Sequence, residues 1–122
     1  MHTYIVNVIA KPGHDEQVAE FYREMEPLYK DAQGFRGRKI YKAKTGAMAE
    51  AVYRHYSAEE LSSHAEPPHE DPGTMFVLIE EWDSVDERIL FSKGLAKGRN
   101  RDLIPHLLPQ HSHEFFEDIS AS

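Results

Sequence analysis

Two histidines near the C-terminus, His111 and His113, have the spacing that most suggests chemistry in this 122-residue chain. One residue separates them in a predicted strand, which places both imidazoles on one face, about 7 Å apart. Metal sites use such a pair when carboxylates join it, and an imidazole can also take a phenolic proton at neutral pH without a metal. No motif such as H-E-x-x-H accompanies the pair, so we favour a base over a metal ligand. The structural alternative is a pair of surface or dimer-contact histidines.

Three further side chains stand out within predicted strands. Asn7 lies among β-branched residues, so its amide either meets a ligand or bridges backbone groups at a dimer interface. Trp82 either packs in the core or donates its indole N–H to a ligand oxygen. Glu80 shares a strand face with Trp82. It is predicted to be either an acid suited to proton transfer or the partner of a cation such as Arg36 or Arg38.

These residues form a predicted site without a metal. The predicted catalytic residues are His111, His113 and Asn7. The predicted substrate-binding residues are mostly aromatic: Trp82, Glu80, Phe76, Tyr41 and Phe91. A basic group between residues 88 and 101 is instead predicted to be a solvated helical face: Arg88, Lys93, Lys97, Arg99 and Arg101.

The element that organises the chain is the apolar run at residues 75–79, which continues through two glutamates to Trp82. Five successive apolar residues are too few for a membrane span and too unbroken for an amphipathic helix, so we predict a central strand buried on both faces. Ser84 and Glu87 then match a capping box, which predicts a helix over 85–93 that ends at Gly94.

The remaining elements follow from periodicity and turn residues. We predict a strand at 3–10, a helix at 14–32 with a kink or break at Pro27, and an edge strand at 35–44. The insertion at 47–73 is expected to hold one or two short helices, the second capped by Ser57 and Glu60, and then an irregular connector. A lid over a cavity or, preferably, a dimer contact is the expected role of four of its residues: His64, Pro67, Pro68 and His69. A helical piece at 99–108 and a polar strand at 111–119 complete the chain.

This order, strand, helix, strand, insertion, strand, helix, strand, predicts an α+β fold. It is the ferredoxin-like β-α-β-β-α-β arrangement, with an antiparallel sheet and helices on one face. We expect one domain over residues 1–122, and a homodimer that covers the other face of the sheet.

The composition narrows the class of partner. Fourteen Lys and Arg against 21 Asp and Glu give a net charge of −7, which argues against nucleic acid or an anionic membrane. The chain has no cysteine, which excludes disulfides and thiolate chemistry. Neither a secretory signal nor a membrane span is predicted, so a cytoplasmic protein is the expectation.

Residues 76–84, followed by a helix, resemble the signature of the antibiotic biosynthesis monooxygenase family, within the dimeric α/β-barrel superfamily. The Pro12-Gly13 turn and the Gly34-Phe35 strand start are also similar. The resemblance implies a dimeric barrel, with a cavity on the sheet face away from the helices. The haem-degrading branch has an asparagine that corresponds to Asn7. Its required tryptophan and histidine fall near Phe91 and Arg101, so haem degradation is not expected.

From this resemblance we expect a homodimeric, cofactor-independent monooxygenase that uses O2 on a small aromatic, quinol or polyketide-like substrate. A base, His111 or His113, would remove a phenolic proton, and Asn7 and Trp82 would stabilise the oxyanion. One alternative is a non-catalytic ligand-binding or structural homodimer. Another is a metal enzyme that uses His111, His113 and a carboxylate.

Overall fold

A computed structural model of the chain describes residues 1–63 and 73–120. Its four strands are β1 (His2–Ala10), β2 (Phe35–Lys42), β3 (Thr74–Trp82) and β4 (Leu107–Phe116). The helices are α1 (Asp15–Asp31), α2 (Ala47–His55), α3 (Ala58–Ser63), α4 (Val85–Lys93) and α5 (Asn100–Leu103), with a 3-10 turn at Ile104–His106. The order is the predicted β-α-β-β-α-β arrangement with a helical insertion between β2 and β3.

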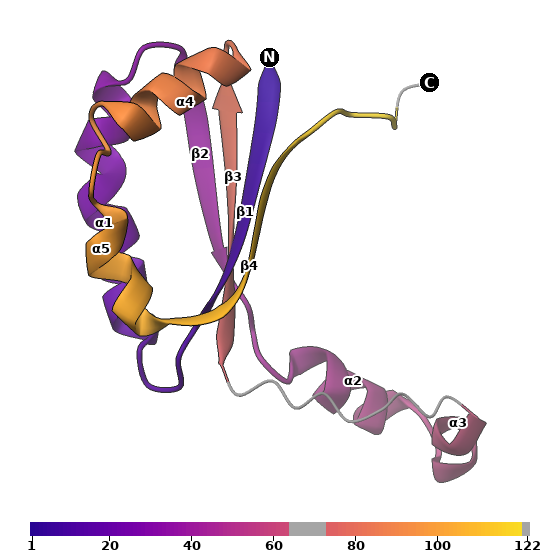
Figure 1. The fold of residues 1–122 in the computed structure, drawn as a ribbon. Coiled ribbons are helices and arrows are strands. Elements are labelled where there is room, and N and C mark those ends of the chain that lie inside the picture. The colour runs from indigo at the N-terminus through magenta and orange to yellow at the C-terminus, as the bar shows by residue number, and fades with distance from the viewer. Residues whose placement is uncertain (64–72, 121–122) are drawn as a thin grey trace.

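The strands form one antiparallel sheet in the order β2-β3-β1-β4. Helices α1, α4 and α5 cover one face of this sheet, while α2 and α3 extend away from it on the opposite side (Figure 1). We call the face under α1, α4 and α5 the helix side and the opposite face the open side. The ferredoxin-like prediction is therefore confirmed.

Alternation along the strands decides which side chains form the core. On β3, Phe76, Leu78, Glu80 and Trp82 are buried on the helix side, whereas Met75, Val77 and Ile79 lie on the open side and are partly exposed. The prediction that β3 is buried on both faces is thus wrong for the single chain, because no layer formed by residues 1–63 and 73–120 covers the open side. The core lies between the sheet and α1, where the side chains of Val8, Val18 and Tyr22 also pack.

At two prolines, the helices and strands of the structure differ from the predicted ones. Helix α1 runs unbroken through Pro27, because Pro27 and Arg23 lie on its exposed face, where water can solvate the carbonyl that loses its partner. The predicted break is therefore wrong. The helical piece predicted to reach residue 108 ends at His106, and β4 begins at Leu107 and includes Pro109. An edge strand such as β4 tolerates a proline, because one of its sides needs no N–H donors.

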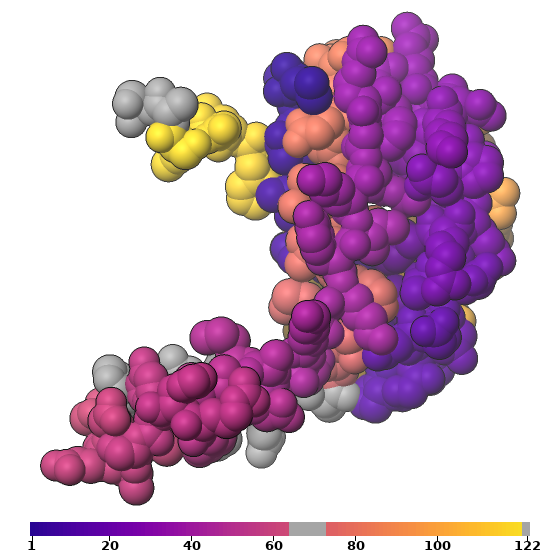
Figure 2. Space-filling view, turned by 180° about the vertical axis from the view of Figure 1, so that it is seen from behind, coloured from indigo at the N-terminus to yellow at the C-terminus, as the bar shows by residue number. Residues whose placement is uncertain are grey.

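Helices α2 and α3, which we call the arm, have no buried residue. A space-filling view shows the arm and the C-terminal segment standing out from the body on the open side, with a hollow between them (Figure 2). The capping box that starts α3 is formed as predicted: Glu60 N–H donates to Ser57 Oγ at 3.1 Å, and Ser57 N–H donates to Glu60 Oε1 at 3.1 Å. The arm is therefore locally well formed without support from the core of this chain.

Candidate functional site

A cavity of about 1030 Å³ lies on the helix side of the sheet, between β1, β4 and the helices α1, α4 and α5. This volume is slightly above the range of about 300–1,000 Å³ that is typical of ligand sites. Apolar and aromatic side chains form most of its wall, among them Val6, Val8, Phe21, Met25, Phe91 and Leu103. A cavity on the face away from the helices, which the resemblance implies for a dimeric barrel, stays a prediction. The cavity found within this chain lies on the helix side.

Glu80 forms the polar floor of this cavity, and its side chain has no exposed surface. Tyr29 Oη donates to Glu80 Oε2 at 2.8 Å, and Trp82 Nε1 donates to Oε1 at 2.9 Å. Arg88 Nε donates to the same Oε1 at 2.8 Å. The carboxylate is thus held by donors from α1, β3 and α4, which is the arrangement that makes a buried charge tolerable.

The cation that pairs with Glu80 is neither of the two predicted. Arg36 pairs with Asp83 at 2.6 Å, and Arg38 reaches Glu26 at 2.5 Å. Although Arg38 lies opposite Glu80 in the sheet, its guanidinium is drawn toward α1. It stacks 4.2 Å from the centre of the Tyr29 ring, and its Nη2 donates to the Tyr22 carbonyl at 2.9 Å.

Arg88, predicted to lie on a solvated helical face, instead points into the site with only 13% of its side chain exposed. Its guanidinium lies over three rings, with centroid distances of 4.7 Å to Tyr4, 5.4 Å to Phe91 and 5.8 Å to Trp82. Cation–π contacts of this kind stabilise a guanidinium that is largely removed from water. The capping box explains the placement. Ser84 Oγ accepts from Glu87 N–H at 3.1 Å, which fixes where α4 begins and directs Arg88 back over β3.

The two C-terminal histidines line the cavity from β4, and their rings stack with centroids 5.9 Å apart. His111 Nδ1 lies 2.9 Å from the carbonyl oxygen of Pro109. A carbonyl only accepts, so Nδ1 carries the proton and the neutral ring keeps its free lone pair on Nε2. His113 has no such anchor among the described residues and lies against the Tyr4 ring, 6.4 Å between centroids. The ring orientation of His111 is therefore fixed by the chain, whereas that of His113 is not.

Three tyrosines, none of them predicted for the site, also line the cavity. Burial raises the pKa of Tyr22 and of Tyr29 well above the usual range, and the nearby charge of Glu80 raises both further. Burial also raises the pKa of Tyr4, although Arg88 opposes the shift. These phenols therefore stay protonated at neutral pH and can act as hydrogen-bond donors.

The structure brings five predicted site residues to one region and leaves three elsewhere. Glu80, Phe91, His111 and His113 line the cavity, and Trp82 lies directly behind Glu80. Phe76 is buried in the core, away from the cavity. Asn7 and Tyr41 lie on the open side, where Asn7 Nδ2 donates to Ser112 Oγ at 2.9 Å. Asn7 and the two histidines thus occupy opposite faces of the sheet.

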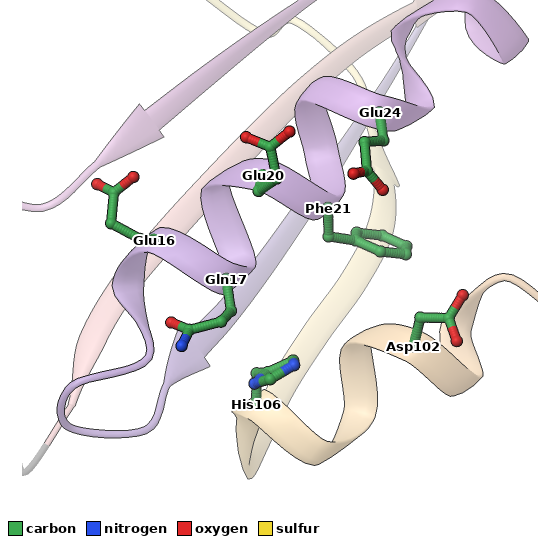
Figure 3. Close-up of a pocket in the computed structure, with 7 residues that line it drawn as sticks. All are labelled: Glu16, Gln17, Glu20, Phe21, Glu24, Asp102 and His106. Atoms are coloured by element: carbon green, nitrogen blue, oxygen red, sulfur yellow. The ribbon is translucent and has the colours of Figure 1, made fainter.

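A second hollow of about 520 Å³ lies on the outer surface between α1 and the α5 region (Figure 3). Its lining is largely acidic, with Glu16, Glu20 and Glu24 on successive turns of α1 and Asp102 beyond the gap. In Figure 3, Gln17 and Phe21 are the α1 side chains that lie toward His106 and Asp102. Among residues 1–63 and 73–120, no three His, Asp or Glu side chains meet in a way that could hold a metal ion.

Across the same residues, no helix is long and apolar enough to cross a membrane. The predicted lid or contact residues of the insertion, from His64 to His69, fall outside the described residues.

Solved structures with this fold provide the comparison. A protein from Bordetella bronchiseptica named as a candidate antibiotic biosynthesis monooxygenase matches with a TM-score of 0.63 and 14% identity, over 97% of this chain and 96% of that one. A similarly named protein from Caulobacter crescentus matches with a TM-score of 0.66 and 10% identity, over 98% and 90% of the two chains. SnoaB from Streptomyces nogalater, named as a cofactor-independent oxygenase, matches with a TM-score of 0.58 and 11% identity, over 98% and 95%. No family model and no curated protein matches the sequence.

The chain has the fold of the antibiotic biosynthesis monooxygenases.

Within this antibiotic biosynthesis monooxygenase fold, sequence reasoning missed Tyr4, Tyr22 and Arg88 at the site. A signal for Arg88 was present, because the capping box at Ser84 places it one turn into a helix that leaves β3 two residues after Trp82. Alternation along β1 places Tyr4 on the same strand face as Val6 and Val8, which is the face that lines the cavity. The sequence did not reveal that the cavity lies on this face of the sheet rather than on the face that carries Asn7.

Proposed function

We propose that this protein is a homodimeric, cofactor-independent monooxygenase that oxidises a small aromatic, quinol or polyketide-like substrate with O2. The observation that carries the proposal is the aromatic-lined cavity into which His111, with its tautomer fixed by Pro109, presents a basic nitrogen. The fold shared with SnoaB, a cofactor-independent oxygenase, supports the same class of reaction. We also propose that the enzyme is cytoplasmic.

The chemistry requires a substrate that can itself reduce oxygen. In the proposed reaction His111 Nε2 removes a proton from a phenol or from an acidic ring carbon, and the resulting anion passes one electron to O2. The two radicals combine as a peroxide, which loses water and leaves a carbonyl. One CH2 group and one O2 molecule thus become one C=O group and one water molecule. The apolar wall would exclude bulk water from the reactive anion.

The developing oxyanion needs neutral or cationic donors, and the cavity offers the Tyr4 and Tyr22 hydroxyls and Arg88. We prefer these groups to Asn7 and Trp82 as the donors that stabilise the oxyanion. Asn7 lies on the other face of the sheet, and the Trp82 N–H already serves Glu80. On the open side, Asn7 fits its structural alternative, an amide at the contact between two sheets.

Oxygen uptake by metal-free protein with a panel of hydroquinones and anthrones tests the proposal. We expect uptake to fall by about 10²-fold or more in His111→Gln, the range in which general bases contribute. A smaller change is expected in His113→Gln, whose ring is not anchored. Asn7→Ala serves as the control on the open side and should retain uptake. Uptake that is the same in wild-type and all three variant proteins would refute the assignment.

A non-catalytic ligand-binding homodimer remains the second candidate, because a cavity of this size suits binding as well as turnover. Saturable binding of the same hydroquinones without oxygen uptake would select it.

A further inference from the structure

We propose that the cavity selects aromatic substrates that carry a carboxylate, and that Arg88 is the residue that binds this group. The proposal rests on the proposed function only in taking the cavity as the substrate site, and it does not depend on the oxidation step.

The charge inside the cavity is opposite in character to that of the chain as a whole. Of the 21 acidic residues, Glu80 alone among the described ones lines the cavity, whereas Lys11 and Arg88 both do. The oxygens of Glu80 are already taken by Tyr29, Trp82 and Arg88, and its side chain is fully buried. A ligand in the cavity therefore meets the exposed edge of Arg88 rather than the carboxylate beneath it.

Arg88 retains hydrogen-bonding capacity for such a ligand. Its Nε donates a hydrogen bond to Glu80 Oε1, and its Nη1 donates one to Ser92 Oγ. No described residue accepts a hydrogen bond from Nη2. A guanidinium carries five N–H donors, so the pairing with Glu80 leaves some of them free for a second oxygen acceptor. Tyr22, whose hydroxyl also has no partner among the described residues, lines the same cavity and can add a neutral donor.

The guanidinium is also held in place before a ligand arrives. The Glu80 bond fixes one edge, and the rings of Tyr4, Phe91 and Trp82 pack around its plane. A donor that is already ordered loses little conformational freedom on binding, so more of the interaction appears as affinity. The adjoining aromatic wall is suited to hold the ring system of the same ligand.

One guanidinium with a free edge suits a monoanion such as a carboxylate. A phosphate dianion is usually met by several donors or by the N-terminus of a helix, and the first residues of α4, Val85 to Glu87, do not line this cavity. Helix α5 has only four residues, so its N-terminus is a weak anion site. We therefore infer an aromatic carboxylate rather than an aromatic phosphate.

The test uses 2-naphthoate and its neutral counterpart 2-naphthamide, two ring systems that need no oxidation to bind. Isothermal titration calorimetry without oxygen is expected to show 2-naphthoate binding to the wild-type protein about tenfold or more tighter than 2-naphthamide. In Arg88→Met this preference should disappear, while 2-naphthamide binding stays within about twofold. Lys93→Met, an exposed change on the same helix outside the cavity, is the matched control and should keep the preference.

Arg88→Met leaves the buried Glu80 without its cation and can fail to fold, so the double variant Glu80→Gln with Arg88→Met restores neutrality. The wild-type comparison needs no variant at all. Equal affinity of the two probes for the wild-type protein, no binding of 2-naphthoate, or a preference that survives in either folded Arg88 variant would each overturn the proposal. If the protein prefers 2-naphthoate but shows no oxygen uptake with the hydroquinones and anthrones, this inference stands and the proposed oxygenase is refuted.

Discussion

Glu80 has no exposed surface, yet its two oxygens accept hydrogen bonds from Tyr29, Trp82 and Arg88. A buried carboxylate of this kind is stable only while its partners stay in place. Because the donors come from α1, β3 and α4, the same group that floors the cavity also joins two helices to the sheet. A change at Glu80 is therefore expected to alter both the cavity and the stability of the fold.

Replacing Glu80 by glutamine keeps the side-chain size but leaves the largely buried Arg88 without its counter-charge. We expect Glu80→Gln to lower the free energy of unfolding by about 3 kcal/mol, the lower end of the range for a broken buried ion pair. Urea denaturation followed by far-ultraviolet circular dichroism measures the change.

The matched control is Asp83→Asn, which breaks the exposed pair with Arg36. The Arg36 hydrogen bond lowers the pKa of Asp83, so the pair stabilises the fold above the ordinary carboxyl range and loses this effect as the pH falls through the lowered pKa. Solvent screening makes the contribution small. An equal loss in the two variants at neutral pH would show that Glu80 is no more than another surface carboxylate.

At the level of single residues, the sequence predicted part of the candidate site. Alternation along β3 placed Glu80 and Trp82 on one face, and the H-x-H spacing placed His111 and His113 together. The Ser84 capping box indicates that Arg88 lies on the first turn of α4, but a basic residue on a polar helix has no pattern that distinguishes a buried cation from a solvated one. Its burial depends on the direction in which α4 crosses the sheet.

Among the elements, α4 shows how a local signal sets a distant contact. Ser84 Oγ accepts from Glu87 N–H, and Ser84 Oγ also lies 2.9 Å from Glu87 Oε1. Removing this cap in Ser84→Ala is expected to destabilise the protein by about 1 kcal/mol. Because the first turn of α4 carries Arg88, we also expect weaker binding of 2-naphthoate in this variant. Thermal unfolding and calorimetry measure the two effects.

Ser84→Thr, whose hydroxyl can still accept the Glu87 N–H bond and donate to Glu87 Oε1, is the control and should behave close to wild type. A Ser84→Ala protein with unchanged stability would mean that packing of Phe91, rather than the cap, holds α4.

Element types and order were predictable because strands, caps and turns are encoded over a few residues. Boundaries near proline were not. Pro27 is accommodated within α1 and Pro109 within β4, in each case because the missing donor faces solvent. Which side of an element faces solvent is decided by the assembled fold.

For the molecule as a whole, the open side of the sheet is the surface left to be explained. Ile5, Val77 and Ile79 lie there and are partly exposed. The arm and the C-terminal segment stand out from the body on the same side (Figure 2). A second copy that packs its own open side here would cover the aliphatic surface, and the arm would lie alongside it. This is the homodimer we propose.

A charge at the centre of that surface should prevent association. We expect Val77→Lys to convert a dimer to a monomer in analytical ultracentrifugation at micromolar concentration. Val85→Lys, an exposed valine on α4 away from the open side, is the matched control and should remain dimeric. A wild-type protein that sediments as a monomer at all concentrations tested would contradict the arrangement.

The fold was predictable as a whole, but the location of the cavity was not. The sequence pattern specifies which residues share a strand face. It does not specify how far α1, α4 and α5 stand from the sheet, and this separation creates the space around Tyr4 and Phe91. The cavity therefore lies on the face of Glu80, whereas Asn7 lies on the opposite face.

Trp82 gives the protein a built-in optical reporter. It is the only tryptophan, it is fully buried, and its indole nitrogen is bonded to the carboxylate that also holds Arg88. Its fluorescence should therefore be blue-shifted in the native protein and should respond when the guanidinium moves. One unlabelled emission band would then follow the junction of β3 and α4 separately from the arm, which contains no tryptophan.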